Sequence, residues 1–351
     1  MEAEDQSSKL KGTYAVIKAW VLDLYELELE RICKIVEIVR ARRVLVQMPD
    51  GLKRYAINIM KFLQDRLPHV LLMFSSSKSY GSCDIAFDEA MALNADLIVH
   101  LGHTPRRYEG PIPVIYIPCY SKVRPLKSLE ELSDRLKDFK IIGLSSVVQH
   151  ENLLSEVREA LEREGFKVII GNDPRLPPGV VVGCDYTQAL SIDSIVEAHL
   201  IIAGGLFHAI GLLMLSKRPV FLLDPYRDVI VDVEKEYRRL LSIKLSVMCK
   251  ALEAKTFGII VCLKSGQFSL SRALEAKRLL EEKGYEALII VMRDVDPALL
   301  EGFSGIDVFI NTCCPRLSFD DLEAFRRPLI TLYDLQFILR KELDKYVPRI
   351  R

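Results

Sequence analysis

Short apolar runs rich in Val, Ile and Leu alternate with longer amphipathic segments along the whole chain. Parallel strands that are buried on both faces have such runs, and the amphipathic segments between them are typical of crossover helices. The first pass through this pattern predicts strands at 43–48, 69–76, 96–102 and 113–118, with helices over 52–67 and 88–95.

The same order then recurs twice. The second pass predicts a helix over 151–165 and strands at 140–146, 167–171, 179–184, 199–205 and 219–225. The third pass predicts a helix over 269–284 and strands at 257–263, 285–292, 307–313 and 328–334.

Three prolines mark the period of this repeat. Pro113, Pro219 and Pro328 each begin the last strand of a pass, and they lie about 105 to 110 residues apart. Recurrence of one βαβ order at one spacing indicates three copies of a small unit. We therefore predict the α/β class, with three similar small parallel-sheet domains around a central site at the carboxyl ends of their strands. The predicted domains are 1–121, 122–233 and 234–351.

Composition narrows the class of protein. Of 351 residues, 50% are hydrophobic, which is enough for sizeable cores, and 48 basic residues balance 48 acidic ones. Zero net charge argues against direct binding of nucleic acid or an anionic membrane through bulk charge. The acidic, polar N-terminus has no secretory signal, and no apolar run reaches the roughly 18 residues that a membrane helix needs. We expect a cytoplasmic protein with reduced cysteines.

Three of the eight cysteines stand at predicted strand ends, one in each repeat: Cys83 in SYGSCDIAFDEA, Cys184 in VVVGCDYTQAL and Cys314 in NTCCPRLSFDD. Three thiolates would suit a soft metal centre such as a 4Fe-4S cluster with one open position, whereas structural zinc takes four ligands. Spacing alone leaves incidental core thiols as the alternative, because the chain has no CxxC pair. Four other cysteines are interpreted as small buried hydrophobes: Cys33, Cys119, Cys249 and Cys262.

Other polar or flexible groups follow predicted strands. Gly204 and Gly205 join a strand to a helix start, where exposed amides suit a carboxylate or phosphate. Gln47 and Asp50 flank the turn after the first strand, although Pro-Asp-Gly is also ordinary turn chemistry. Arg316 could grip a carboxylate with its guanidinium fork. The histidines at strand ends or in the glycine-rich turn have structural roles as the alternative to catalysis: His100, His103 and His208.

Five segments together resemble a known family, the archaeal diphthamide-biosynthesis enzymes called 2-(3-amino-3-carboxypropyl)histidine synthases. The segments are QMPDGLK, YGSCDIAFDEA, VVGCDYTQA, GGLFHAIGLLMLSKRPVFLLDPY and NTCCPRLSFDD. The resemblance implies a homodimer of three-domain chains in which Cys83, Cys184 and Cys314 bind a 4Fe-4S cluster. One departure is the doubled Cys313-Cys314, where the family usually has a small residue before the ligand.

The resemblance also implies a reaction. S-adenosylmethionine would bind the unique iron of the reduced cluster, and cleavage of its Cγ,Met–S bond would yield a 3-amino-3-carboxypropyl radical and methylthioadenosine. The radical would add to the imidazole C2 of a histidine on translation elongation factor 2. An unidentified electron donor would supply the electron that reduces the cluster. No residue is assigned as the acceptor of the imidazole proton. From their strand-end positions, we expect five residues to hold the cofactor: Gln47, Asp50, Gly204, Gly205 and Arg316.

Three alternatives remain at this point. Quinolinate synthase is another triplicated α/β enzyme with a three-cysteine cluster, whose open iron is a Lewis acid. A non-catalytic helper would only transfer electrons to a partner's cluster. A structural zinc protein would be colourless.

Overall fold

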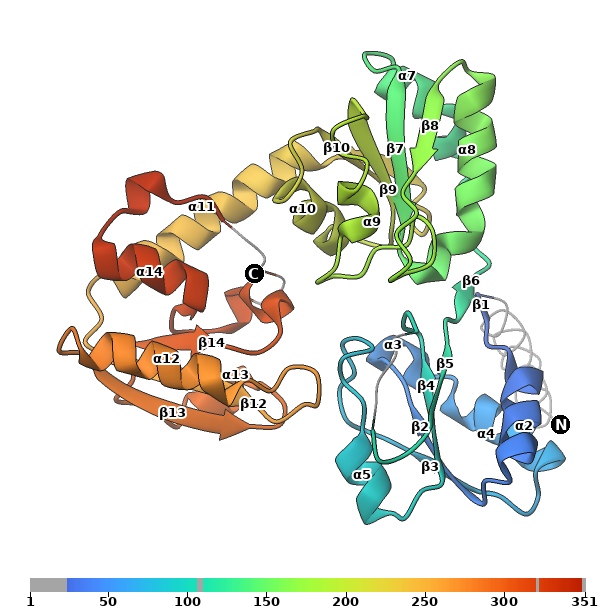
Figure 1. Ribbon diagram of the computed structural model, residues 1–351, viewed down its shortest axis with the longest axis horizontal. Coiled ribbons are helices and arrows are strands. Elements are labelled where there is room, and N and C mark those ends of the chain that lie inside the picture. Colours follow the sequence, from blue (N-terminus) through green and yellow to red (C-terminus); the bar gives the residue numbers. More distant parts are fainter. Residues whose placement is uncertain (1–23, 106–109, 320–321, 349–351) are drawn as a thin grey trace, which may run out of the picture. The chain divides into compact units, whose positions relative to one another are not determined.

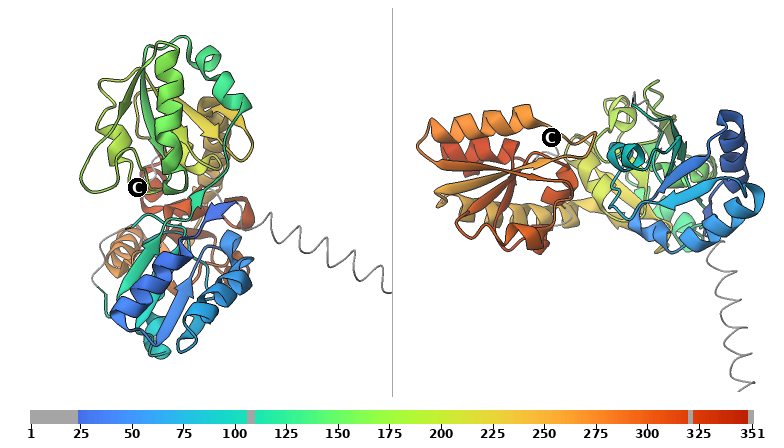
Figure 2. Two further views of the ribbon diagram at one scale, coloured as in Figure 1. Left: turned by 90° about the vertical axis from the view of Figure 1, so that its right-hand side faces the viewer. Right: turned by 90° about the horizontal axis from the view of Figure 1, so that it is seen from below.

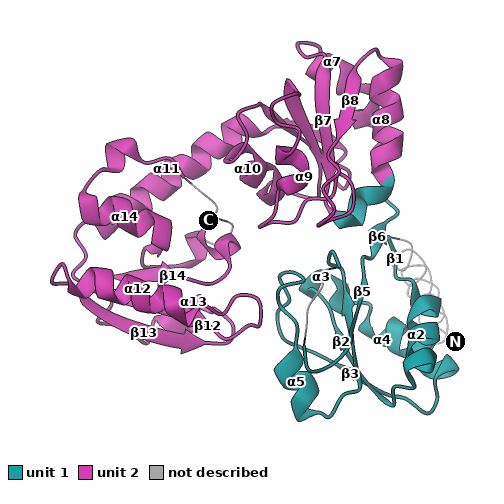
Figure 3. Cartoon of the chain, in the orientation of Figure 1, with its two compact units in different colours: residues 1–124, 148–152 teal, residues 125–147, 153–351 magenta. Residues whose placement is uncertain are grey.

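The computed structural model describes residues 24–105, 110–319 and 322–348. The chain divides into two compact units (Figure 3): unit 1 comprises Met1–Arg124 and Val148–Asn152, and unit 2 comprises Pro125–Val147 and Leu153–Arg351. Unit 1 contains one parallel sheet and unit 2 contains two further sheets. The prediction of the α/β class with parallel sheets is therefore confirmed.

Unit 1 is built on a four-stranded parallel sheet in the order β3-β2-β4-β5 (Figure 1). Its strands are β2 (Arg43–Gln47), β3 (Leu71–Phe74), β4 (Leu97–Leu101) and β5 (Val114–Ile117). Its helices are α2 (Leu29–Val39), α3 (Asp50–Lys53), α4 (Ala56–Arg66) and α5 (Phe87–Ala92). A small antiparallel pair, β1 (Tyr25–Glu26) with β6 (Tyr120–Ser121), completes the unit.

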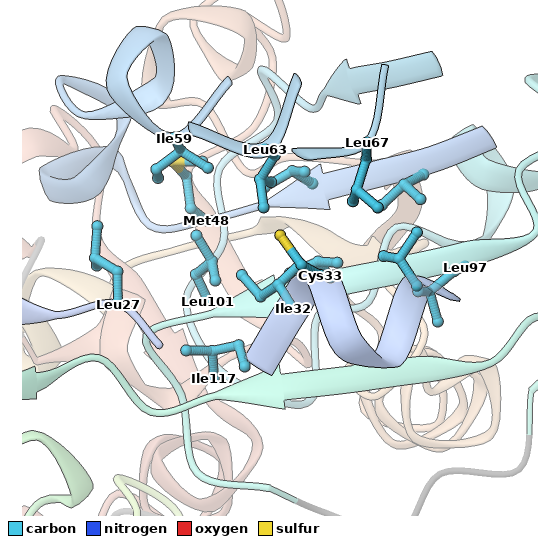
Figure 4. Packing of buried hydrophobic residues seen from close by; sticks show 14 of the residues in the cluster. Leu27, Ile32, Cys33, Met48, Ile59, Leu63, Leu67, Leu97, Leu101 and Ile117 are labelled. Carbon is cyan, nitrogen blue, oxygen red and sulfur yellow. The ribbon is translucent and has the colours of Figure 1, made fainter. Parts of the chain in front are cut away.

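The core of unit 1 lies between its sheet and two helices (Figure 4). Ile32 and Cys33 of α2 and Ile59 and Leu63 of α4 pack with Leu97 of β4. Ile59 and Leu63 are four apart, and Val36 follows Ile32 and Cys33 by four and three residues, so each helix buries one face. Burial raises the pKa of the Cys33 thiol, as expected for a cysteine that packs as a small hydrophobe.

A short segment beyond the sheet of unit 1 belongs to the same compact body. It is most of the 3₁₀ helix Val148–Leu153. The Gln149 side-chain amide donates to the Gly102 carbonyl at 2.6 Å, and the Asn152 amide donates to the Ser121 carbonyl at 3.1 Å. These bonds attach the segment to the loop after β4 and to strand β6.

The second sheet has five strands in the order β8-β7-β9-β10-β11 and lies in unit 2. The strands are β7 (Ile141–Ser146), β8 (Lys167–Ile170), β9 (Ala198–Ile202), β10 (Val220–Asp224) and β11 (Val229–Asp232). The helices are α6 (Lys127–Glu130), α7 (Leu132–Leu136), α8 (Leu154–Arg163), α9 (Thr187–Leu190) and α10 (Phe207–Leu213).

The third sheet has four parallel strands in the order β13-β12-β14-β15. The strands are β12 (Thr256–Cys262), β13 (Glu286–Met292), β14 (Val308–Asn311) and β15 (Leu329–Thr331). The helices are α11 (Val233–Ala251), α12 (Leu270–Glu281), α13 (Pro297–Leu300) and α14 (Leu332–Arg340). Single 3₁₀ turns lie at Pro315–Ser318, Leu322–Ala324 and Leu343–Lys345. Figure 2 shows helices on both faces of this sheet.

All three sheets share one strand order, in which the first strand of the pass lies between the second and the third. The chain therefore reverses its direction of winding between the first and third strands of each sheet. In open parallel sheets, ligands bind outside the carboxyl ends of the strands at this switch point. Every candidate ligand cysteine lies in a loop at such an end.

Four details differ from the sequence-based expectation. Residues 179–184 form isolated bridges and a turn rather than a strand. The antiparallel strand β11 and the long helix α11 were not predicted. The predicted strand at 328–334 ends at Thr331, whose side chain caps α14 by accepting from the Asp334 N–H. Cys249 is exposed rather than buried, because Lys244, Met248 and Ala251 form the buried face of α11.

Among the residues that the structure describes, we find no helix with the length and apolar character required to cross a bilayer.

Candidate metal centre

The first candidate ligand, Cys83, lies in the turn between β3 and α5 of unit 1. The Asp84 N–H donates to the Gly81 carbonyl at 3.0 Å, which closes the turn around Cys83. The Tyr116 hydroxyl of β5 donates to the Ser82 carbonyl at 3.5 Å. The backbone is thus held on both sides of Cys83, whose side chain is half-buried.

Gln47, at the end of β2, forms hydrogen bonds with the backbone of the same turn. Its Nε2 donates to the Asp84 carbonyl at 2.7 Å, and its Oε1 accepts from the Ala86 N–H at 3.0 Å. The Gln47 side chain is buried. Its amide therefore binds the backbone that follows Cys83.

Two histidines extend this arrangement. His100 is the register partner of Gln47 on β4, and its Nδ1 lies 3.0 Å from Gln47 Oε1. His100 Nε2 lies 2.8 Å from Nδ1 of His103. Burial, with a smaller contribution from the charge of His103, holds the pKa of His100 well below its ordinary value, so His100 is neutral at pH 7.

Asp50 has different surroundings. It begins α3, and its carboxylate pairs with Lys53 Nζ at 2.6 Å. The Asp50 side chain is 63% exposed, so the described contacts of this carboxylate are on the surface and do not include the Cys83 turn.

The second candidate ligand, Cys184, lies at the tip of a tight turn in unit 2. Val182 and Asp185 exchange backbone hydrogen bonds of 3.0 and 2.8 Å across Gly183 and Cys184. The Asp185 carboxylate then accepts from the Thr187 N–H and hydroxyl at the start of α9. Cys184 is half-buried and is held by the turn rather than by a strand.

Phe207, the first residue of α10, contacts the loops of both candidate ligands in unit 2. A Cβ atom at Gly183 would lie 2.3 Å from the Phe207 ring, so the glycine allows the Cys184 turn to lie against this ring. The Arg316 guanidinium lies over the same ring, 4.6 Å from its centroid. Arg316 follows Cys314 by two residues, so Phe207 connects the Cys184 turn to the Cys314 loop.

Gly204 and Gly205 lead directly into this helix. Gly205 has φ +99°, a left-handed conformation that favours glycine. A Cβ atom at Gly204 would lie 2.7 Å from the Tyr226 ring. The structure therefore brings Gly204, Gly205 and Arg316 to one region of unit 2, around Phe207.

The third candidate ligand is one of the paired thiols Cys313 and Cys314, which follow β14. The Cys313 thiol is directed at the end of β12, with its Sγ 3.5 Å from the Ile260 carbonyl. A hydrogen bond with Cys262, together with burial, raises the pKa of Cys313 far above its ordinary value. The Asn311 amide donates to the Cys314 carbonyl at 2.9 Å and fixes that backbone. Cys313 is thus a half-buried thiol that its hydrogen bond with Cys262 keeps protonated at neutral pH, and Cys314 follows it in the loop.

Sequence reasoning missed a polar cluster at the same end of the third sheet. Lys264 is buried and pairs with Asp294 at 2.8 Å, and the amide oxygen of Gln267 lies 3.7 Å from Cys262 Sγ. Both Lys264 and Gln267 follow β12, the first strand of the pass. Strand β12 corresponds to β2, whose carboxyl end also has polar residues, and this shared location is the signal that could have identified them.

The donor chemistry of the three turns suits a thiolate-bound cluster. Cys83, Cys184 and Cys314 form no disulfide and are half-buried, each in a loop at the carboxyl end of a sheet. Cys119, by contrast, is buried, which raises its pKa to about 12. Within the described ranges, no three metal-binding side chains lie together as a closed site; Cys83 belongs to unit 1 and the other two belong to unit 2.

Comparison with known proteins gives consistent matches over most of the chain. The model of a family described as "Putative diphthamide synthesis protein" matches residues 48–347. The 2-(3-amino-3-carboxypropyl)histidine synthase of Pyrococcus horikoshii is 35% identical over 320 residues, covering 90% of this chain and 91% of that protein. Subunit 1 of the Schizosaccharomyces pombe enzyme is 28% identical, covering 88% and 72%.

A solved structure is similar over nearly the same extent. Dph2 from Pyrococcus horikoshii, described with a 4Fe-4S cluster, has a TM-score of 0.82 and 32% identity, and the match covers 93% of this chain and 94% of that chain. The family model spans the segments that contain all three turns. The chain belongs to the diphthamide synthesis protein family.

Proposed function

We propose that this chain is a 2-(3-amino-3-carboxypropyl)histidine synthase, which catalyses the first step of diphthamide formation. It transfers the 3-amino-3-carboxypropyl group of S-adenosylmethionine to C2 of a histidine imidazole on translation elongation factor 2. The observation that carries the proposal is the 35% identity to a synthase of that name over 90% of the chain. Membership of this family also argues against the quinolinate synthase alternative.

Cys83, Cys184 and Cys314 would hold the 4Fe-4S cluster. The support is their shared setting, because each is a half-buried thiol in a strand-end turn, and the similar Dph2 structure is described with such a cluster. When bound, the cluster supplies one electron and an open iron position. The turns of this chain fix where each sulfur lies and limit the access of water.

Cys314 rather than Cys313 is the ligand in the loop after β14. Cys313 Sγ is directed at the backbone of β12 and hydrogen-bonds with Cys262. Its raised pKa disfavours the thiolate form that a metal requires. Cys314 therefore takes this role, with the Asn311 amide holding its carbonyl.

The S-adenosylmethionine subsite includes Gly204, Gly205 and Arg316. Gly205 leaves open space near the start of α10, Gly204 lies against the Tyr226 ring, and Arg316, stacked on Phe207, presents a cation for the methionine carboxylate. Gln47 belongs to the site through the Cys83 turn, while the exposed Asp50 carboxylate would contact the adenosine or the amino group directly.

The proposed domain arrangement, oligomeric state and partners are those implied by the resemblance to the family. The three parallel sheets correspond to three domains, at 1–121, 122–233 and 234–351, arranged around the cluster. The working form is a homodimer in the cytoplasm, which receives its electron from a separate donor protein. Elongation factor 2 docks as a folded protein, consistent with the zero net charge of the chain.

The test is turnover by the purified chain without any partner subunit. After anaerobic cluster reconstitution, the chain is incubated with dithionite, S-adenosylmethionine and archaeal elongation factor 2. We expect methylthioadenosine and a 3-amino-3-carboxypropyl adduct on one histidine-containing peptide by mass spectrometry. Production of neither compound by a cluster-loaded chain would contradict the proposal and favour the helper role.

A further inference from the structure

Behind the Cys83 turn, three buried or half-buried side chains form a continuous hydrogen-bonded series. Gln47 Nε2 faces the Asp84 carbonyl, and only a donor can face a carbonyl. The orientation of the Gln47 amide is therefore fixed, and Oε1 is the atom that accepts from the Ala86 N–H.

This orientation determines the tautomers of the histidines. Gln47 Oε1 has no proton, so His100 Nδ1, at 3.0 Å, must donate to it. A neutral His100 then has a lone pair on Nε2, which accepts from His103 Nδ1–H at 2.8 Å. The series therefore runs in one direction, from His103 through His100 to Gln47.

The far end of the series is also anchored. Gly102, the neighbour of His103, accepts from the Gln149 amide at 2.6 Å, and Gly102 has φ +79° in a tight turn against Pro49. The loop of His103 is therefore held by a hydrogen bond from Gln149. His103 contacts His100, His100 contacts Gln47, and Gln47 binds the backbone beside Cys83.

We propose that His100 and His103 are positioning residues for the cluster: they lock Gln47, and Gln47 holds residues 84–86 so that Cys83 presents its sulfur in one orientation. This inference rests on the proposed function in one respect, because it takes Cys83 as a ligand. Groups that orient metal ligands typically change metal affinity by about 10-fold to 100-fold when they are replaced.

The test compares Gln47→Leu and His100→Phe with His199→Gln as a matched control. His199 is a second fully buried histidine on the third strand of a sheet, but it lies at the amino end of β9 and pairs with Asp193 at 3.1 Å. After reconstitution of each folded full-length variant, iron is titrated and the reduced cluster is examined by electron paramagnetic resonance. We expect about 10-fold weaker iron retention and an altered signal in the two series variants only.

Gln47→Glu provides a rescue that does not depend on folding differences. At about pH 8.5 its carboxylate would repel the Asp84 carbonyl, whereas a protonated carboxyl can donate to that carbonyl and accept from the Ala86 N–H. Hydrogen bonds from the Ala86 N–H and His100 Nδ1–H lower the pKa of such a carboxyl, and burial at this fully enclosed position raises it by more. The cluster signal should therefore recover toward the wild-type signal as the pH falls to about 6.5. The wild-type signal should stay constant over this range.

Cys83→Ala, measured in parallel, tests the ligand assignment of Cys83 separately from the positioning role of the histidines. Loss of the cluster in Cys83→Ala, with wild-type iron retention and spectra in Gln47→Leu and His100→Phe, would overturn the positioning role alone. Full retention in Cys83→Ala would overturn the ligand assignment and the positioning role together.

Discussion

At the scale of single residues, the doubled cysteine after β14 shows most clearly how the structure distinguishes a ligand from its neighbour. Both thiols follow the same strand, yet Cys313 is directed at the Ile260 carbonyl and hydrogen-bonds with Cys262. The family resemblance assigned Cys314, with Cys313 standing where the family usually has a small residue. The structure adds a physical reason, because the pKa of a buried, hydrogen-bonded thiol is raised and its thiolate is disfavoured.

We predict that Cys314→Ala loses most of the bound iron while Cys313→Ala retains it. The reason is that the Cys313 thiol is directed at the Ile260 carbonyl and hydrogen-bonds with Cys262, which leaves Cys314 as the ligand. The measurement is iron per chain after anaerobic reconstitution, with thermal unfolding as the check that both variants fold. Equal iron loss in the two variants would contradict the assignment.

Gly183 offers a second test at this scale. An alanine there would place its Cβ 2.3 Å from the Phe207 ring, so the ring or the Cys184 turn must move. Overpacking of this kind costs about 1–3 kcal/mol, and we expect weaker cluster retention together with weaker S-adenosylmethionine binding, because Arg316 stacks on the same ring. Calorimetry measures the binding.

The control for that experiment is Gly305→Ala, at an exposed glycine where a Cβ atom would meet nothing within 4 Å. It should leave both cluster and cofactor binding unchanged. Wild-type binding in Gly183→Ala would show that Phe207 does not couple the two loops.

At the scale of elements, α11 and α14 are joined by a buried ion pair. Lys244 Nζ and Asp334 lie 2.6 Å apart with both side chains 1% exposed. The Tyr346 hydroxyl donates to the same carboxylate at 2.7 Å, and burial raises the pKa of Tyr346 strongly. Asp334 also completes the capping box of α14 with Thr331. One carboxylate therefore fixes the helix start and its packing against α11.

We predict that Lys244→Met lowers the free energy of unfolding by about 3 kcal/mol, because it leaves the Asp334 carboxylate buried without its cation. Urea unfolding followed by circular dichroism measures this change. The matched control is Lys345→Met, which removes an exposed partner of Glu342 and should not shift the midpoint. Similar midpoints for the two variants would contradict a structural role for the buried pair.

Element prediction succeeded where burial dominates the pattern. The central strands β2, β4, β7 and β12 contain Val, Ile and Leu at positions that are almost all buried, and they form as expected. The strand prediction failed at 179–184. A run of three valines is typical of a buried strand, but here it forms only isolated bridges around the Cys184 turn. Helix α11 was missed because its buried face includes Lys244, whose charge is compensated by a partner 90 residues away in sequence.

At the scale of the whole molecule, the threefold repeat could be predicted from the sequence, whereas the candidate site could be predicted only in part. Proline spacing and strand order indicated three copies, and the three sheets share one strand order. The cysteine positions at strand ends were also predictable. The side-chain series from His103 to Gln47 was not, because its members come from separate strands and loops that only the fold brings together.

Buried histidines also set a pH dependence for the whole chain. His100 and His150 both have lowered pKa values because of burial, and that of His150 is about 4. Since the unfolded chain binds these protons near pH 6.5 and the folded chain resists them, stability is full above pH 6.5 and falls as the pH drops toward 4.

We predict that His150 alone accounts for roughly 3 kcal/mol of this loss, and that His150→Gln flattens the profile by that amount. The free energy of urea unfolding between about pH 7.5 and about pH 4.5 measures it. A profile that is flat in the wild-type chain over this window would contradict the neutral, buried state of these histidines.

The most direct test of the central claim is the electron paramagnetic resonance spectrum of the reduced, anaerobically reconstituted chain before and after addition of S-adenosylmethionine. A cluster held by Cys83, Cys184 and Cys314 has one iron open to the cofactor. We predict a 4Fe-4S signal that changes when S-adenosylmethionine is added and that is absent in Cys184→Ala. A signal that S-adenosylmethionine leaves unchanged, or that persists in full in Cys184→Ala, would contradict the claim.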